Sequence, residues 1–553
     1  MKTIIVKKSL LYRYQSIGQA IQDAEAGDQI EINGGIYEEI VDVSKRLKIY
    51  GKGDVTIKGN VFIRYNVNAE ICNIRFSQGR GLYVKGNLHL ENCVVEQQSG
   101  SAQVTVNYGS LAMKNVDILG NSATQYGLRI DNGSSVMLET STIQHHSKAQ
   151  IIVQNSELTM SRSKLLEGKV NGIFALKNVQ MDLVDCEIHG HDKAQILLAN
   201  STIVVKNSLI HQGQDTGIQA LEGSKVVMDN CEVKQHGSTD VIVYQSELRA
   251  VNSVFANGPG KGIYIGELSK AIIYECDIYD HVKPQIFIEN SIAEIRKCSV
   301  KNGSATGIHI VNEADVIVAE SDITNHKLFH VIVDSSGLQM ENTLIQHGQS
   351  GGVFGNKHAK ITLRDTTIRE LKSHLVYLNN CRLFTDNCMF THIHGNGISC
   401  IDSIFEIANS QFNDCSQGPY SILWSDKSIG RVENSLVNET ERTFFAITNG
   451  SLIEIINTNL SNVKLGAIVQ ENSNVYVRGH LDEASWQRDA SSRIVNTDSL
   501  PTVSKEKVDR VVNIISGPEG IDIEKLQKEY RIPDVVVEEV QSMIRNENIK
   551  KSI

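Results

Sequence analysis

Proline is nearly absent from this sequence, and aromatic residues are few. Six prolines occur in 553 residues, and phenylalanine, tyrosine and tryptophan together make up 6% of the chain. Collagen-like and low-complexity disordered chains are rich in proline, so both classes are excluded and we expect a chain that is folded throughout. Because 553 residues exceed the size at which one hydrophobic core stops growing, the chain is predicted to form several domains or a repeat array.

Three other features are missing. No uninterrupted apolar run reaches the length of about 18 residues that a membrane helix needs, so no membrane span is expected. No run of lysine and arginine occurs and the net charge is -10, so nucleic acid is not expected as a partner. The ten cysteines contain no C-x-x-C pair and the first residues show no secretory signal, so we expect free thiols in a cytoplasmic protein.

The sequence does contain a repeat of 22 to 24 residues, from about residue 68 to residue 473. Two examples are STIVVKNSLIHQGQDTGIQALEG, from Ser201, and SKVVMDNCEVKQHGSTDVIVYQ, from Ser224. Each repeat holds two short alternating apolar segments separated by Asn, Ser, Gly and His, a pattern that predicts strand, turn, strand, turn. So short a coil leaves no room for a crossover helix, so equivalent strands of successive coils must pair in parallel. We therefore predict a parallel β-helix of about 18 coils, right-handed by the usual chirality of strand crossovers.

Alternate coils differ, which gives a double repeat of 45 residues and two columns of large polar residues. The histidine column comprises His146, His191, His236, His281 and His326, with Gly168, Gly213, Gly258, Gly303 and Gly348 at the same position of the intervening coils. The glutamine column, four residues later, comprises Gln150, Gln195, Asp240, Gln285 and His330. We interpret each imidazole as lying over a neighbouring glycine and bonding a turn carbonyl; the alternative is a row that binds a linear glycan.

Two further columns indicate how the coils stack. One contains small residues, among them Ser163, Cys186, Ser208, Cys231 and Cys276, and is predicted to be a ladder of small buried side chains. The other is predicted to be a turn ladder whose side-chain amides bond the coils above and below; it comprises Asn155, Asn200, Gln245, Asn290, Ser335 and Asn380.

On these repeats the chain resembles the pectin-lyase-like right-handed parallel β-helix superfamily, in particular its carbohydrate-binding and NosD-like branch, over about residues 10–480. The segment YQSIGQAIQDAEAGDQIEINGGIYEEIVDVSKRLKIYGKGDVTIKG is similar to the family's N-terminal cap, which implies a short helix near Ile17 to Ala26 over the open end of the core. The fold class expected is all-β, a right-handed parallel β-helix solenoid with a small C-terminal α-helical domain.

The expected domains are a cap with first coils (1–67), β-helix repeats (68–481), a linker (482–504) and a small helical docking or connector domain (505–553). Apolar residues of this tail recur at helical spacing. The tail carries 9 Lys/Arg against 10 Asp/Glu from residue 501 onward, which argues against a DNA-reading unit. A protein partner is therefore expected to dock on residues 505–553, with an ATPase as the example suggested by analogy alone.

Enzymes of the superfamily act on polysaccharides with clustered carboxylates, Arg or Lys bases, or calcium held by Asp. No column shows Asp or Glu on successive coils, so we expect no catalytic residue, no metal and no cofactor. Histidines two coils apart are separated by about 9.5 Å, whereas the ligands of one metal lie about 2 Å from it. The histidine column is therefore not predicted to bind a metal ion.

The columns become irregular towards the C-terminal third. Irregularity in a repeat favours a binding face. The alternative is that the sequence simply becomes less regular near the end of the solenoid. The predicted ligand-binding residues are His281, Gln285, His326, His330, His347, His374, His392 and His394. The leading hypothesis is a non-catalytic cytoplasmic scaffold or binding protein that recognises a glycan or a protein partner. The alternatives are a polysaccharide lyase or glycoside hydrolase, and a phage tailspike-like protein, which predicts a homotrimer.

Overall fold

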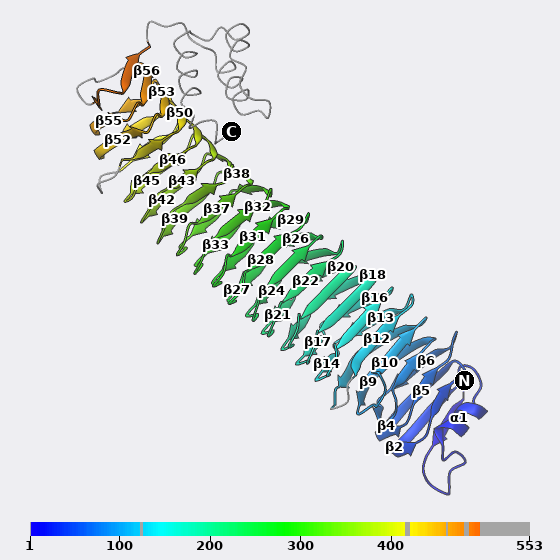
Figure 1. Cartoon of the computed structure of the whole chain (residues 1–553). Coiled ribbons are helices and arrows are strands. Elements are labelled where there is room, and N and C mark those ends of the chain that lie inside the picture. Colours follow the sequence, from blue (N-terminus) through cyan, green and yellow to red (C-terminus); the bar gives the residue numbers. More distant parts are fainter. Residues whose placement is uncertain are drawn as a thin grey trace, which may run out of the picture.

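The chain forms a long parallel solenoid. The computed structural model describes residues 2–121, 125–414, 421–438, 440–460, 463–479 and 486–497. Its strands, from β1 (Thr3–Val6) to β58 (Arg493–Asn496), stack into a rod of about 21 turns (Figure 1). The predicted parallel β-helix is confirmed. The rod has more turns than the 18 expected because irregular coils before residue 68 and after residue 473 extend the repeat at both ends.

Each regular coil contains three strands and therefore contributes to three sheets. In one coil these are β22 (Ile218–Leu221), β23 (Lys225–Asp229) and β24 (Glu232–Lys234). They pair in parallel with β25 (Val241–Tyr244), β26 (Glu247–Val251) and β27 (Val254–Ala256) of the next coil. We call the three sheets first, second and third in this order. The prediction of two strands per coil is wrong because the third strand, at three residues, is too short to show an alternating pattern.

The corners between strands are bends at residues with a left-handed backbone. In the same coil Glu222, Asn230 and Gln235 have φ of 54°, 52° and 61°. Asparagine tolerates this conformation better than most residues, which explains why it is frequent at the corners. The predicted turn ladder lies at such corners, with φ between 44° and 56° at Asn155, Asn200, Gln245, Asn290, Ser335 and Asn380. The amide-to-amide bonds expected there occur at another corner, as between Asn230 and Asn207 at 2.9 Å.

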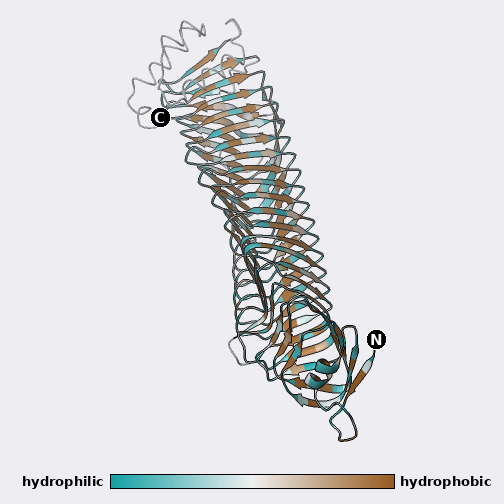
Figure 2. Ribbon diagram, turned by 90° about the vertical axis from the view of Figure 1, so that its right-hand side faces the viewer, coloured by the Kyte–Doolittle hydropathy of each residue, from teal (hydrophilic) through white to brown (hydrophobic). Residues whose placement is uncertain are grey.

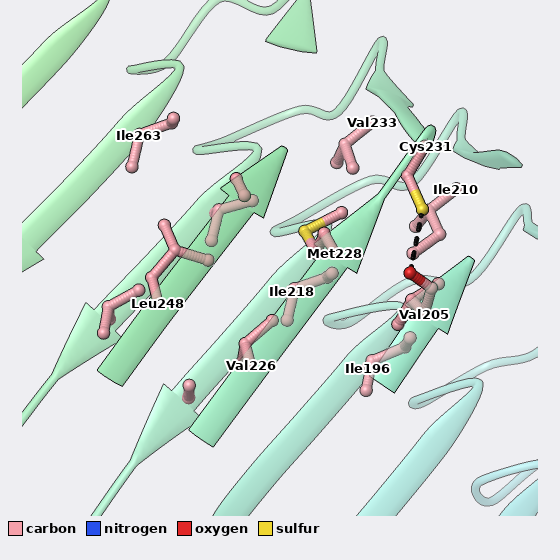
Figure 3. Packing of buried hydrophobic residues seen from close by; sticks show 14 of the residues in the cluster. Ile196, Val205, Ile210, Ile218, Val226, Met228, Cys231, Val233, Leu248 and Ile263 are labelled. Atoms are coloured by element: carbon pink, nitrogen blue, oxygen red, sulfur yellow. Dashed lines mark hydrogen bonds between the residues drawn. The ribbon is translucent and has the colours of Figure 1, made fainter. Parts of the chain in front are cut away.

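The interior is filled by the inward-facing residues of all three sheets. Apolar and polar residues alternate along the strands (Figure 2). Ile218, Val226 and Val233 face inward from the three strands of the coil, and each is fully buried (Figure 3). The small column lies at the edge of this core, where the backbone N–H of Cys231 donates to Ser253 Oγ at 3.1 Å. The cysteines within the described residues are free and buried, which confirms the prediction of a small-residue ladder.

A helix covers the N-terminal end of the core. Helix α1 (Ile17–Asp23) packs its apolar face against β1, β2 (Gln29–Glu38) and β3 (Val41–Val43). The predicted cap helix is confirmed, although it ends three residues earlier than expected, at Asp23. Within the part of the chain that the structure describes, no helix has the length and apolar character needed to span a bilayer.

Glu39 holds the start of this cap helix. Its carboxylate accepts hydrogen bonds from the backbone N–H groups of Ile17 and Gly18, each at 2.9 Å, and from Ser16 Oγ at 2.8 Å. Because a carboxylate at a helix N-terminus satisfies free N–H groups and the positive end of the helix dipole, Glu39→Ala should destabilise the cap by about 1 to 2 kcal/mol. Hydrogen exchange of the α1 amides should speed up. Glu38→Ala, at the neighbouring exposed position, is the control and should leave the exchange unchanged.

The C-terminal end of the solenoid lies further along the chain than predicted. Strands β57 (Trp486–Arg488) and β58 pair in parallel with β55 (Val463–Val469) and β56 (Asn474–Arg478). The linker expected over residues 482–504 is therefore wrong for 486–497, which form a last coil. The predicted helical domain, 505–553, lies outside the described residues.

Candidate functional site

The histidine and glutamine columns lie inside the solenoid. The exposed fractions of His281, Gln285, His326 and His330 are 1%, 0%, 0% and 0%. A polymer outside the rod cannot contact side chains that the coils enclose. The prediction that these four residues bind a ligand is therefore wrong.

Inside the rod, the columns bond one another. His191 Nδ1 bonds Gln195 Oε1, and His236 Nδ1 lies 2.8 Å from Asp240 Oδ1. Asp240 Oδ2 also lies 2.8 Å from Nε2 of His281, two coils further on. The glycines make room for the rings, since a Cβ on Gly168 would stand 2.7 Å from His191 Cδ2. The expected packing of imidazole over glycine is confirmed, but the partner of Nδ1 in these pairs is a side chain four residues later, not a turn carbonyl.

Burial also sets the charge of the column. It lowers the pKa of His146 and of His191 to about 4, with the bonds to Gln150 and Gln195 acting in the opposite direction. Burial and the neighbouring His330 lower the pKa of His326 to about 2. These three rings are therefore neutral at pH 7. Neutral, enclosed and packed, they have a structural role.

The remaining predicted histidines reach the surface but do not converge on one site. His347 is exposed, with Nδ1 2.8 Å from a carboxylate oxygen of Glu370, and His392 is exposed, with Nε2 3.0 Å from a carboxylate oxygen of Asp414. His394 is exposed at a corner of the coil. His374 is half-buried on a different face, beside the first sheet. Ligand binding by these four residues stays a prediction.

A row of mostly aromatic side chains runs along the outer face of the first sheet. It comes from one outward position on six successive strands: β28 (Ile263–Gly266), β31 (Ile286–Glu289), β34 (Ile308–Val311), β37 (Val331–Asp334), β40 (Val353–Asn356) and β43 (Val376–Asn379). The strands lie in the C-terminal half of the rod (Figure 1). We call this row the aromatic ridge; it consists of Tyr264, Phe287, His309, Ile332, Phe354 and Tyr377, all half-buried and each paired in register with the next.

Neighbouring rings of the ridge touch. Tyr264 and Phe287 stack with their centroids 5.7 Å apart, and His309 meets Phe287 edge-on at 5.1 Å. Phe354 and Tyr377 stack at 5.5 Å. Two further rings widen this second stack: Phe329 lies 5.3 Å from Phe354, and His374 lies 5.1 Å from Tyr377. The ridge is thus a continuous, partly exposed apolar strip that is wider than one side chain.

Charged groups flank the first stack of rings. Lys261 Nζ lies 4.7 Å from the ring centroid of Tyr264 and 4.4 Å from that of Phe287. Burial, reinforced by the charge of Lys283, lowers the pKa of Lys261. Glu289 accepts a hydrogen bond from the Tyr264 hydroxyl at 2.9 Å, and burial together with this carboxylate raises the pKa of Tyr264.

His309 shares this environment. Burial lowers its pKa, Asp334 opposes that shift, and the positive charge of Lys261 adds to it. A cation, a carboxylate and a neutral imidazole therefore lie beside the same apolar strip. Such a surface offers apolar contacts together with both hydrogen-bond donors and acceptors.

The ridge was not predicted from the sequence, in which the polar columns are the more regular feature. The signal exists: its members are spaced alternately by 23 and 22 residues, from Tyr264 to Tyr377. They occupy the variable position of the G-I-x-I segment. Successive residues of a strand point to opposite faces of the sheet, so an aromatic residue at this position points outward while the isoleucines on either side of it point inward.

The comparisons with known proteins agree with the geometry. A family model described as "Right handed beta helix region" matches residues 49–205, 195–345 and 329–460. These matches extend over most of the chain, which therefore belongs to the right-handed β-helix family. No curated protein matches the sequence.

Several solved structures are similar in fold. A periplasmic alginate epimerase is 9% identical, with 62% of this chain and 83% of that chain covered and a TM-score of 0.33. The A-module of a mannuronan C-5 epimerase from Azotobacter vinelandii is 12% identical, with 70% and 91% covered and a TM-score of 0.25. A pectate lyase is 9% identical, with 62% and 78% covered and a TM-score of 0.22. Identities this low carry no information on the activity of this chain.

Proposed function

We propose that this β-helix binds an anionic polysaccharide along the aromatic ridge. The observation that carries the proposal is the ridge itself, a strip of six outward side chains in register, half-buried and flanked by Lys261. Contiguous exposed apolar strips are uncommon on soluble proteins and mark interaction surfaces. A β-helix keeps such a strip straight and rigid.

The spacing of the ridge suits a linear polymer of sugars. Paired strands are about 4.8 Å apart, so the ridge offers one side chain per 4.8 Å or so along the rod. A sugar unit in an extended chain advances by a similar length. Sugar rings present apolar C–H faces and polar edges, which match rings such as Phe287 and neighbouring polar groups such as Glu289.

The charge of the polymer is inferred from Lys261. A half-buried cation between two rings is less hydrated than a free lysine, so an anionic partner gains more from pairing with it. A uronate polymer carries a carboxylate on every unit and is the class expected. Binding should weaken as salt is raised, since ions screen this attraction.

Truncation of the ridge tests the proposal. Tyr264→Ala combined with Phe287→Ala removes the first ring stack and should weaken binding to a uronate polymer, such as alginate or polygalacturonate, by about tenfold or more. Affinity electrophoresis in gels containing the polymer measures the change. The matched control is Phe174→Ala with Leu197→Ala, a paired, half-buried couple at the same position of the same sheet. Equal retention of both variants, or no retention of the unmodified protein by any uronate polymer, contradicts the proposal.

A second candidate function is lyase activity on the same polymer, favoured by the lowered pKa of Lys261 and of His309 on one strip. In such a β-elimination a base removes the proton next to the uronate carboxylate, the glycosidic C–O bond breaks, a C=C bond forms, and the departing oxygen takes a proton. The neutral His309 is suited to act as the base. A lyase produces unsaturated ends that absorb ultraviolet light. His309→Gln should abolish that signal while lowering polymer retention less than the Tyr264→Ala, Phe287→Ala double variant does, whereas absence of the signal in the unmodified protein excludes this reading.

A further inference from the structure

The third sheet carries a cluster of metal-binding side chains on its outer face. Glu187 and His189 lie on β19 (Glu187–His189), and His211 lies on β21 (Leu209–His211) of the next coil. In the register of this pair, His189 stands beside His211 and Glu187 beside Leu209. Ile188 and Ile210 between them point into the core, as Figure 3 shows for Ile210, so their neighbours point outward. This strand is the one that the sequence pattern did not reveal.

The three side chains converge on a small volume. Glu187 Oε1 lies 3.4 Å from His211 Nε2 and 3.8 Å from His189 Nε2. The ring centroids of the two histidines are 4.8 Å apart. Ligand atoms about 2.0 to 2.1 Å from a tetrahedral zinc ion are about 3.3 to 3.4 Å from one another. The two spacings that involve Glu187 Oε1 are thus close to those of a bound site. One potential ligand atom from each of the three residues lies within 4.8 Å of the others.

The surroundings prepare these groups for a cation. Lys164 Nζ lies 2.7 Å from Glu187 Oε2, the oxygen that does not face the imidazoles, so it orients the carboxylate and leaves Oε1 available. The side chains of His189 and His211 are 22% and 13% exposed, which limits their motion while a small ion can still reach them.

We propose that Glu187, His189 and His211 bind a divalent transition-metal ion of the zinc class on the outside of the third sheet. Two imidazole nitrogens and one carboxylate oxygen are donors typical of zinc and unlike the all-oxygen sets that calcium and magnesium take. The site is independent of the aromatic ridge, which lies on the first sheet. It joins two successive coils.

Metal is removed from the full chain with a chelator, and the chain is then dialysed against micromolar zinc chloride. Bound zinc is counted per chain for the unmodified protein, a double variant and a control variant. Compared with the unmodified protein, His189→Gln combined with His211→Gln should lose one bound ion and weaken cobalt(II) binding, followed by visible absorption, by about tenfold or more. The control His145→Gln removes an exposed histidine that pairs with Glu167 at 3.4 Å and does not belong to the three-residue cluster, and it should bind zinc as the unmodified protein does.

Circular dichroism verifies that each variant keeps the β-helix. Glu187→Gln provides a second test, because it preserves the shape of the side chain and removes its charge; it should weaken zinc binding as well. Zinc binding that is absent from the unmodified protein, or equal in the unmodified protein and the double variant, overturns the proposal and leaves a hydrogen-bonded Glu–His cluster without a metal.

Discussion

Acid is expected to destabilise the solenoid between pH 6.5 and about pH 4, through the buried histidine column. His146 and His191 have a pKa of about 4 in the folded chain against an ordinary value of 6.5. Between these values the unfolded chain binds more protons, so stability falls as the pH falls. The contribution of each neutral ring to the free energy of unfolding is fully present above pH 6.5. By pH 4 the loss should be on the order of 3 kcal/mol per ring.

One coil of the chain already carries apolar residues at these two positions, which shows how the acid sensitivity can be removed. Further along the two columns, Leu371 and Leu375 replace the histidine and its partner, and both are fully buried. Gly348 and Gly352 face Leu371 much as Gly168 and Gly172 face His191. The double variant His191→Leu with Gln195→Leu should therefore fold, and its thermal unfolding midpoint should fall less between pH 7 and pH 4 than that of the unmodified protein. His145→Gln is the control, since its side chain is exposed. An unaltered acid sensitivity of the double variant would show that the column does not take up the protons.

Substitution of alanine for a glycine that faces a ring of the histidine column should destabilise the fold. A Cβ on Gly303 would stand 2.5 Å from His326 Cδ2, whereas a Cβ on Gly258 would stand 3.2 Å from His281 Cδ2. Enclosed on all sides, the ring of His326 has little room to move, so Gly303→Ala should destabilise the solenoid by about 1 to 3 kcal/mol. The chemical denaturation midpoint measures the loss.

Gly258→Ala is the matched control for this substitution, because it adds the same carbon in the same column with more space. Its cost should be clearly smaller than that of Gly303→Ala. Equal costs would mean that the crowding in the column does not decide stability.

The coil could be predicted from the sequence because its period is strict over some four hundred residues. Asn155 and its equivalents recur at the corners of successive coils, as the cysteine ladder recurs at the edge of the core. The helix near Ile17 lies where a solenoid needs a cap. The third strand could not be predicted, since three residues such as Glu187–His189 carry no recognisable alternation. The number of coils was underestimated for a related reason: the end coils depart from the period.

The site was harder to predict because a column in the sequence does not reveal on which side of the backbone it lies. His189 and His191 are two residues apart, yet the first is partly exposed and the second is enclosed. The difference arises at the corner between them, where Gly190 has a φ of 76° and interrupts the alternation of a strand. Polar residues in register thus suggested a binding row, whereas they form an internal ladder. The outward apolar ridge was not predicted.

The inner columns serve the fold, and the outer ridge is proposed to bind the ligand. Polymer retention of two double variants, measured in one affinity electrophoresis experiment with a uronate polymer, separates these two roles. His326→Leu with His330→Leu changes two of the predicted ligand residues inside the rod and should leave retention unchanged. Tyr264→Ala with Phe287→Ala changes the ridge and should abolish most of it. Loss of retention in the first variant and its persistence in the second would contradict the account.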